Sequence, residues 1–187
     1  MLSTLLLAIA LLFFAIAQSA PRRPPNNYPY MDAETSQRFA AGQAAIDALL
    51  QEFGENNEAI DGVNYPDDYG GRYFDKQGYL YIITTKENFD DISFLSDNPV
   101  IKDCVIYKYA PHSYKELRRL QVFLSDYGLD FGISYIGIAE TQNVVGVGLL
   151  TLRNKEAILH FLRNNYKGFD ESMVVFAQSE RAVQLAN

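Results

Sequence analysis

The order of hydrophobic periodicities between residues 104 and 178 most constrains what this chain can fold into. Two segments there repeat apolar residues at helical spacing, and four short segments alternate with the period of two that is typical of strands. The six segments are 104–110, 113–128, 132–139, 144–150, 155–166 and 173–177. Their order, β-α-β-β-α-β, is the split βαβ or ferredoxin-like order. It predicts an α+β fold in which one antiparallel sheet carries both helices on one face.

Local signals mark where two helices begin. Ser113 and Glu116 have the spacing of a capping box, in which each side chain satisfies a backbone N–H group of the other residue. Further upstream, Asp32 can cap a helix whose apolar residues recur at helical spacing as far as Phe53, just before Gly54. Both helices are therefore expected.

A β-hairpin and a short helix are expected between these two helices. Two β-type runs at 72–75 and 79–84 flank a short turn, and Gly78 can supply the positive φ that such a turn requires. A short helix over 87–95 should follow, because Pro99 lies just beyond it.

The N-terminus has the pattern of a secretory signal. The apolar run over 5–17 is too short for a membrane-spanning helix, which needs about 20 residues, and Ala17 and Ser19 form a small-residue cleavage site. Because Arg22 and Arg23 follow this run and no basic residue precedes it, an uncleaved membrane anchor through residues 5–17 is the alternative. The expected localisation is secreted or extracytoplasmic.

These signals divide the chain into five parts. The expected parts are a signal peptide at 1–19, a Pro-rich linker at 20–31, a helix, hairpin and short helix at 32–103, a ferredoxin-like core at 104–178 and a C-terminal tail at 179–187.

Composition excludes several classes of function. One Cys and two His cannot supply a structural zinc site or an internal disulfide, and a net charge of −7 gives no general basic field for nucleic acid. Cys104 begins an apolar strand and is expected to be buried and inert. Asp67-Asp68 and Asp90-Asp91 lack the spacing of a calcium loop. No cofactor or metal site is therefore expected.

The two histidines do not form a recognisable catalytic group. His112 precedes a helix cap, and His160 lies opposite the apolar stripe of its helix. A nucleophile with a base also needs an orienting carboxylate and an oxyanion site, which the sequence does not assemble. The expectation is a protein without enzymatic activity; an enzyme that uses one of these histidines is the rival hypothesis.

Alternation along the strands predicts which residues lie on the open side of the sheet. If the aliphatic positions face the helices, the other face carries tyrosines and glycines, and tyrosine is common at protein interfaces. The expected partner-binding residues are Tyr107, Tyr109, Tyr135, Gly146 and Gly148. The alternative is that the hairpin at 72–84 or the N-terminal helix covers this face.

Several segments resemble the pro-region of secreted bacterial serine proteases of the α-lytic protease and streptogrisin type. The similar segments are Tyr69–Thr84, Val105–Tyr109, Ser113–Gln121, Ile136–Ile138 and Asn143–Gly148, within a likeness that covers about residues 65 to 178. In that family the pro-region is a folding chaperone and tight inhibitor of the attached protease. Its sheet docks on the protease and its C-terminal tail enters the active-site cleft.

The resemblance implies a binding function that is exercised in trans, because no protease sequence follows residue 187. The expectation is a secreted, non-enzymatic module that inhibits a chymotrypsin-like serine protease or helps it to fold. The alternative is a cell-envelope or extracellular interaction module that keeps the fold without protease binding. Neither alternative involves nucleic acid, nor a membrane once the leader is cleaved.

Overall fold

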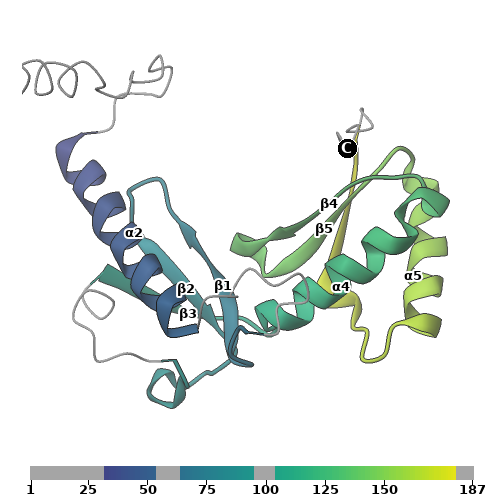
Figure 1. The fold of residues 1–187 in the computed structure, drawn as a ribbon. Helices are drawn as coiled ribbons and strands as arrows, with labels where there is room; N and C mark the ends of the chain where they lie inside the picture. Colours follow the sequence, from purple (N-terminus) through teal and green to yellow (C-terminus); the bar gives the residue numbers. More distant parts are fainter. Residues whose placement is uncertain (1–31, 54–63, 95–103, 180–187) are drawn as a thin grey trace, which may run out of the picture. The chain divides into compact units, whose positions relative to one another are not determined.

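The computed structural model describes three stretches of the chain, namely residues 32–53, 64–94 and 104–179. The predicted signal peptide at 1–19 and linker at 20–31 lie outside the described residues, as does the predicted tail beyond Ser179. The strands that are described form two separate three-stranded sheets (Figure 1).

The N-terminal sheet is built from a hairpin and one parallel strand. Its order is β1 (Tyr69–Phe74), β2 (Leu80–Thr84) and β3 (Val105–Tyr109). β1 and β2 are antiparallel, whereas β3 runs parallel to β2. α2 (Ala33–Phe53) packs on this sheet, which confirms both the predicted helix and the predicted hairpin.

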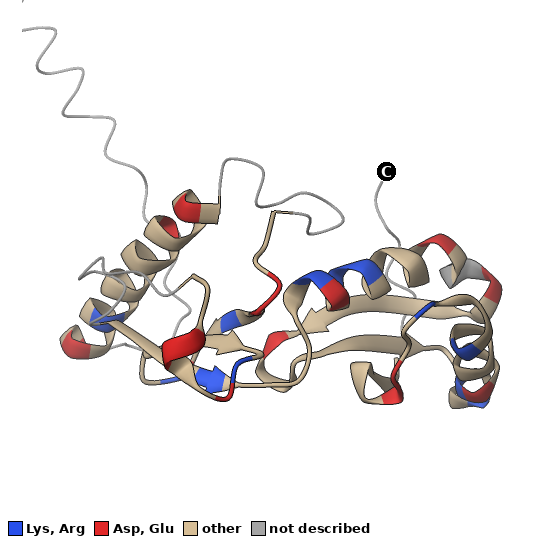
Figure 2. Ribbon diagram, turned by 90° about the horizontal axis from the view of Figure 1, so that it is seen from below, with Lys and Arg blue, Asp and Glu red and all other residues tan. Residues whose placement is uncertain are grey.

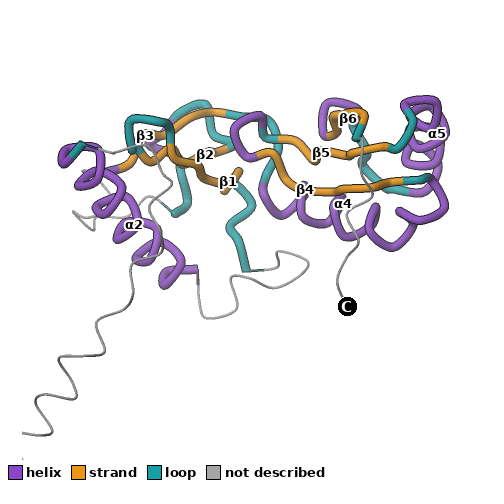
Figure 3. The backbone as a smooth tube through the Cα atoms, turned by 90° about the horizontal axis from the view of Figure 1, so that it is seen from above, coloured by secondary structure: helices purple, strands orange, loops and turns teal. Residues whose placement is uncertain are grey.

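The C-terminal sheet contains β4 (Ile133–Ala139), β5 (Val144–Leu149) and β6 (Val174–Gln178), side by side in that order (Figure 3). β4 and β5 are antiparallel, and β6 runs parallel to β5. α4 (Tyr114–Tyr127) precedes β4, and α5 (Lys155–Asn165) connects β5 to β6. The predicted helices and strands of this region are all present.

The capping box that was predicted before α4 is present. The Ser113 N–H donates to Glu116 Oε2 at 2.9 Å, and the Glu116 N–H donates to Ser113 Oγ at 3.2 Å. These two bonds satisfy backbone donors that the first turn of a helix leaves without partners. In contrast, the predicted short helix over 87–95 is reduced, among residues up to 94, to a 3-10 turn over Phe89–Asp91.

The α+β class is confirmed, but the pairing of the first strand of the predicted core is wrong. The elements of residues 104–178 follow the predicted order, yet β3 pairs with β2 and does not enter the sheet of β4, β5 and β6. Both sheets are mixed rather than purely antiparallel. The ladder between β2 and β3 extends to Ala110, whose N–H donates to Thr84 O at 2.9 Å. The periodicity of a strand does not specify the strand with which it pairs, and here β3 pairs with β2 of the hairpin.

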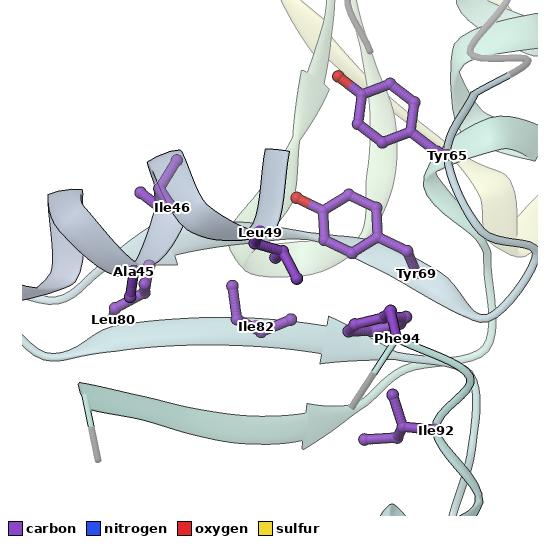
Figure 4. Close-up of a cluster of buried hydrophobic side chains, with 9 residues drawn as sticks. All are labelled: Ala45, Ile46, Leu49, Tyr65, Tyr69, Leu80, Ile82, Ile92 and Phe94. Carbon is purple, nitrogen blue, oxygen red and sulfur yellow. The ribbon is translucent and has the colours of Figure 1, made fainter. Parts of the chain in front are cut away.

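The core of the N-terminal sheet lies between the sheet and α2. It combines aliphatic side chains from the helix and from β2 with aromatic side chains from the loops and β1 (Figure 4). Its buried members are Ala45, Ile46, Leu49, Tyr65, Tyr69, Leu80, Ile82, Ile92 and Phe94. Burying one such large apolar side chain contributes about 1.5–3 kcal/mol to stability.

A second core joins α4, α5 and one face of the C-terminal sheet. Its buried members are Leu117, Leu120, Leu124, Val145, Val147, Leu149, Ile158, Leu162 and Met173. Because both helices contribute to one cluster with alternate residues of β5, they cover the same face of the sheet, as predicted. The opposite face carries the intervening residues.

The two sheets repeat one topology. In each, an antiparallel hairpin is followed by a third strand that runs parallel to the second strand and pairs with its free side. The hairpin turns also match, because Asp75-Lys76-Gln77-Gly78 and Glu140-Thr141-Gln142-Asn143 both end in a residue of positive φ, 84° for Gly78 and 55° for Asn143. β3 therefore closes the first sheet in the way that β6 closes the second.

Among residues 32–53, 64–94 and 104–179, no helix has both the length and the hydropathy that crossing a bilayer requires.

Candidate functional site

The structure divides the five predicted partner-binding residues between two sheets. Tyr107 and Tyr109 lie on β3 in the N-terminal sheet, whereas Tyr135, Gly146 and Gly148 lie on β4 and β5 in the C-terminal sheet. The predicted single tyrosine face is therefore not formed. The cause is that β3 pairs with β2, a strand of the hairpin of residues 72–84. This hairpin was one of the two alternative covers expected for the predicted face.

Tyr107 is half-buried against the N-terminal core and is not an open anchor. Its side chain packs against the buried cluster, and its ring centroid lies 6.2 Å from that of Phe89. Its hydroxyl is buried without a hydrogen-bond partner, and burial raises the pKa of this phenol. Tyr109, two residues later on the same side of β3, is 44% exposed.

Replacing Tyr107 by Phe should leave the stability unchanged or increase it by about 1 kcal/mol, because a buried hydroxyl without a partner is a cost that Phe removes. Urea unfolding monitored by circular dichroism measures this change. Tyr109→Phe is the matched control and should have no effect. A clear loss of stability in Tyr107→Phe alone would contradict the interpretation.

Three glycines lie on the face of the C-terminal sheet opposite the helices, namely Gly137, Gly146 and Gly148. Gly137 is paired with Gly146, and Tyr135 with Gly148, so three of these four positions carry no side chain. Tyr135 is 56% exposed, and its ring folds over Gly137 so closely that a Cβ atom at that position would overlap it. Tyr135, Gly146 and Gly148 thus lie on the same face of the sheet, as predicted, but of the three only Tyr135 is exposed, and Gly148 is buried.

The two edges of the C-terminal sheet differ. β4 has a register shift between Ile133 and Tyr135, an irregularity that commonly prevents further strand pairing. β6 is regular, and none of the described strands pairs with its outer side. Its sequence, Val-Val-Phe-Ala-Gln, contains neither Lys nor Pro, the residues that usually protect an edge.

The peptide groups on the outer side of β6 can be assigned from one hydrogen bond. The Ser179 N–H donates to Leu149 O at 2.8 Å, so the peptide group of Ser179 faces β5. Since peptide groups alternate in direction along a strand, the N–H and C=O groups of Phe176 and Gln178 face away from β5. These groups can form a ladder with an added strand.

A cavity of about 310 Å³ adjoins this edge. Its lining comes from α5, from β6 and from the two 3-10 turns that flank α5. The lining residues are Leu152, Lys155, Leu159, Glu171, Val174, Val175 and Phe176. No residue of β4, β5 or α4 lines it, so the cavity borders β6 and α5 and not the middle of the sheet. Leu152 is 46% exposed at its rim, although the neighbouring stretch is polar.

The charges at the rim of the cavity differ in their partners. Glu171 forms an ion pair with Arg163. The Nζ atom of Lys155 lies 6.0 Å from the centre of the Phe176 ring, and no ion pair of Lys155 occurs among the described residues. Basic and acidic positions are otherwise interspersed along α4 and α5 (Figure 2). Lys155 is therefore available to a carboxylate of a partner.

His112 is held in place by hydrogen bonds to neighbouring residues of the fold. Its backbone N–H and C=O both bond to the Asn143 side chain, and its ring Nε2 lies 3.0 Å from Ser172 Oγ. A catalytic triad would also place a carboxylate on the other ring nitrogen. The nearby Asp170 instead accepts a hydrogen bond from the Ser172 N–H at 2.8 Å, and this bond holds the pKa of its carboxyl below the usual range. His160 is exposed and contacts Asn164.

Both carboxylates of Asp67-Asp68 have partners within the protein. Asp67 accepts a hydrogen bond from Lys115 Nζ at 2.6 Å, and this bond and the charge of Lys115 lower the pKa of the carboxyl. The buried carboxylate of Asp68 accepts from the N–H and hydroxyl of Ser93. Within the described ranges, no cluster of His, Cys, Asp or Glu has the geometry to hold a metal ion. Cys104 is a free, half-buried thiol that packs against the N-terminal core.

Neither the cavity beside β6 nor the residues that line it were predicted from the sequence. Leu150 and Leu152 gave a signal, because they extend the apolar pattern past the end of β5 into a segment that is otherwise polar. No protein-family model and no curated protein sequence matches the chain. A functional proposal therefore rests on the geometry of the two sheets and on the resemblance of the segments quoted above to protease pro-regions.

Proposed function

We propose that this chain is a secreted, non-enzymatic protein-binding module that pairs the open edge of β6 with a strand of its partner. The observation that carries the proposal is the regular outer edge of β6 beside an apolar cavity. An exposed edge offers main-chain hydrogen bonds, and a neighbouring pocket offers selectivity for side chains.

Comparison of the four sheet edges favours β6. β1 has a register shift between Tyr69 and Gly71, and β4 has the shift described above. β3 carries the exposed Lys108, which disfavours strand addition. β6 has neither feature along Val174–Gln178.

The proposed partner is a secreted chymotrypsin-like serine protease. This class follows from the resemblance of segments such as Tyr69–Thr84 and Ser113–Gln121 to protease pro-regions. The chain would act in trans, either as an inhibitor or as a helper in folding. A rigid edge, held by α5 and the C-terminal core, loses little conformational freedom on binding, which favours tight association.

The experiment adds the purified chain from residue 20 onward to chymotrypsin-like secreted serine proteases from the same source. We expect equimolar chain to slow hydrolysis of a peptide substrate, or to speed recovery of activity after the protease is diluted from denaturant. If no such protease responds in either assay, the protease assignment fails. The extracellular interaction module then becomes the better hypothesis.

An edge variant tests the mode of docking. Gln178→Pro removes an N–H that faces away from β5, so the pairing of β5 with β6 should survive while an added strand loses a donor. We expect protease binding to weaken about tenfold or more, which corresponds to ~1.4 kcal/mol. Gln178→Ala keeps the N–H and should bind normally. Equal affinities of the two variants would contradict strand addition at β6.

A further inference from the structure

We propose that the cavity beside β6 is a side-chain pocket that selects the strand added there. The pocket takes one large apolar side chain of the partner, and Lys155 pairs with a carboxylate close to it. This inference rests on the proposed strand addition and names the chemistry of the segment that is bound. The occupant is an extended segment of another protein.

The direction of side chains in β6 connects the edge to the cavity. Val174 and Phe176 point to the helix side, where they pack against the C-terminal core and line the cavity. An added strand lies about 4.8 Å from β6, and its side chains alternate in the same way. Those on the helix side would stand next to Val174 and Phe176 and meet Leu152 and Leu159.

The chemistry of the lining favours an apolar occupant. Five of the seven lining residues are aliphatic or aromatic, and the volume of about 310 Å³ is large enough for a bulky side chain. A large apolar side chain that enters the cavity removes its own surface and that of the lining from solvent.

The charge at the rim adds a polar preference. Glu171 is engaged by Arg163, which leaves Lys155 as the lining charge without an ion pair among the described residues. Its ammonium group lies over Phe176, next to the outer edge of β6. A carboxylate two residues from the apolar anchor would lie on the same face of the added strand and could reach it.

The test uses a phage-displayed library of disulfide-closed β-hairpins with one randomised strand, selected on the chain from residue 20 onward. We expect the enriched strands to share a large apolar residue, with Asp or Glu two positions away. Hydrogen exchange of the bound state, with one synthetic hairpin of the enriched sequence, should show new protection at the amides of Phe176 and Gln178.

Two matched pairs of variants assign the contacts. Leu152→Asp should weaken the synthetic hairpin about tenfold or more, whereas Leu150→Asp should not, although the two side chains have similar exposures of 46% and 50%. Lys155→Glu should change the enriched charge from acidic to basic. Lys167→Glu makes the same change of charge at an exposed position outside the cavity and should leave the selection unaltered.

The outcomes separate this inference from the proposed function. Absence of an enriched pattern, or a pattern and affinity unchanged in Leu152→Asp and Lys155→Glu, overturns the pocket. If a protease is still inhibited in that case, the proposed function stands without the pocket. If hairpins bind as expected and no protease responds, the pocket stands and the protease assignment fails.

Discussion

Replacing Asn143 by Ala is expected to lower the free energy of unfolding by about 3–6 kcal/mol, because it leaves three buried backbone groups without their partner. The Asn143 side chain is 2% exposed. Its Oδ1 accepts from the His112 N–H at 2.9 Å, and its Nδ2 donates to Gly70 O at 3.0 Å and to His112 O at 2.8 Å. One side chain thus joins the hairpin of the C-terminal sheet to β1 and to the loop after β3.

A second variant separates the backbone effect from the hydrogen bonds. Asn143 has a φ of 55°, in the left-handed region that Ala adopts at a cost. Gly at this position relieves that cost, as Gly78 does in the equivalent turn of the N-terminal sheet. We therefore expect Asn143→Gly to be more stable than Asn143→Ala, yet still clearly less stable than the natural chain.

Chemical unfolding monitored by far-UV circular dichroism measures both variants. Asn143→Asp is a further control, because its carboxylate can still accept from the His112 N–H but would face two carbonyl oxygens. It should be at least as unstable as Asn143→Ala at neutral pH. If Asn143→Gly were as stable as the natural chain, the three hydrogen bonds would not contribute as inferred.

Tyr69→Ala is expected to cost about 3–5 kcal/mol, the range found when a large aromatic side chain is removed from a core. The Tyr69 side chain is fully buried. Its ring centroid lies 5.1–5.8 Å from those of four other aromatic side chains. These are Phe53, Tyr65, Phe94 and Tyr114. The cavity left by Ala would remove contacts with α2, with both loops of the N-terminal half and with α4.

Tyr69→Phe keeps the ring and removes only the hydroxyl, which accepts a hydrogen bond from Arg72 at 3.2 Å. The loss should be about 1 kcal/mol. Equal losses in Tyr69→Ala and Tyr69→Phe would show that the hydrogen bond, and not the ring packing, is the main contribution. Urea unfolding of the two variants side by side makes the comparison.

Tyr69 also predicts sensitivity to alkaline pH. Burial holds the pKa of its phenol well above the ordinary value of about 10, although Arg72 acts in the opposite direction. The unfolded chain then loses its proton first as the pH rises. The stabilising contribution of the raised pKa is fully present below pH ~10. Above this pH, the free energy of unfolding falls by about 1.4 kcal/mol per pH unit. Tyr69→Phe should show a shallower decrease between pH ~10 and ~11.5.

The helices and the hairpins were largely predictable from local pattern. The spacing of apolar residues in α2 and α4, the Ser113–Glu116 capping box and the positive φ of Gly78 depend on neighbours within a few residues, and the structure shows all of them. Pairing between strands was not predictable in the same way, because a partner far along the chain leaves no mark on a strand's own alternation.

In the candidate site, too, features that depend on near neighbours were predictable and features that depend on distant segments were not. Tyr135, Gly146 and Gly148 share one face of the sheet as predicted, because they belong to one hairpin whose register follows from its turn, but Gly148 is buried there. Tyr107 and Tyr109 were misplaced with β3. Leu152, Lys155 and Phe176, which line the groove at β6, come from three different elements, so their proximity depends on the packing of α5 and was not visible beforehand.

The sequence by itself determined the α+β class, the positions of most helices and strands, and the scarcity of Cys and His. Only the tertiary structure decided that β3 is the third strand of the first sheet, that Tyr107 packs against the N-terminal core, and that none of the described strands pairs with the outer edge of β6 beside the cavity. The physical reason is the range of the interactions. Helices and tight turns are stabilised by contacts between near neighbours, whereas sheet order and cavities result from contacts between segments that meet only in the folded chain.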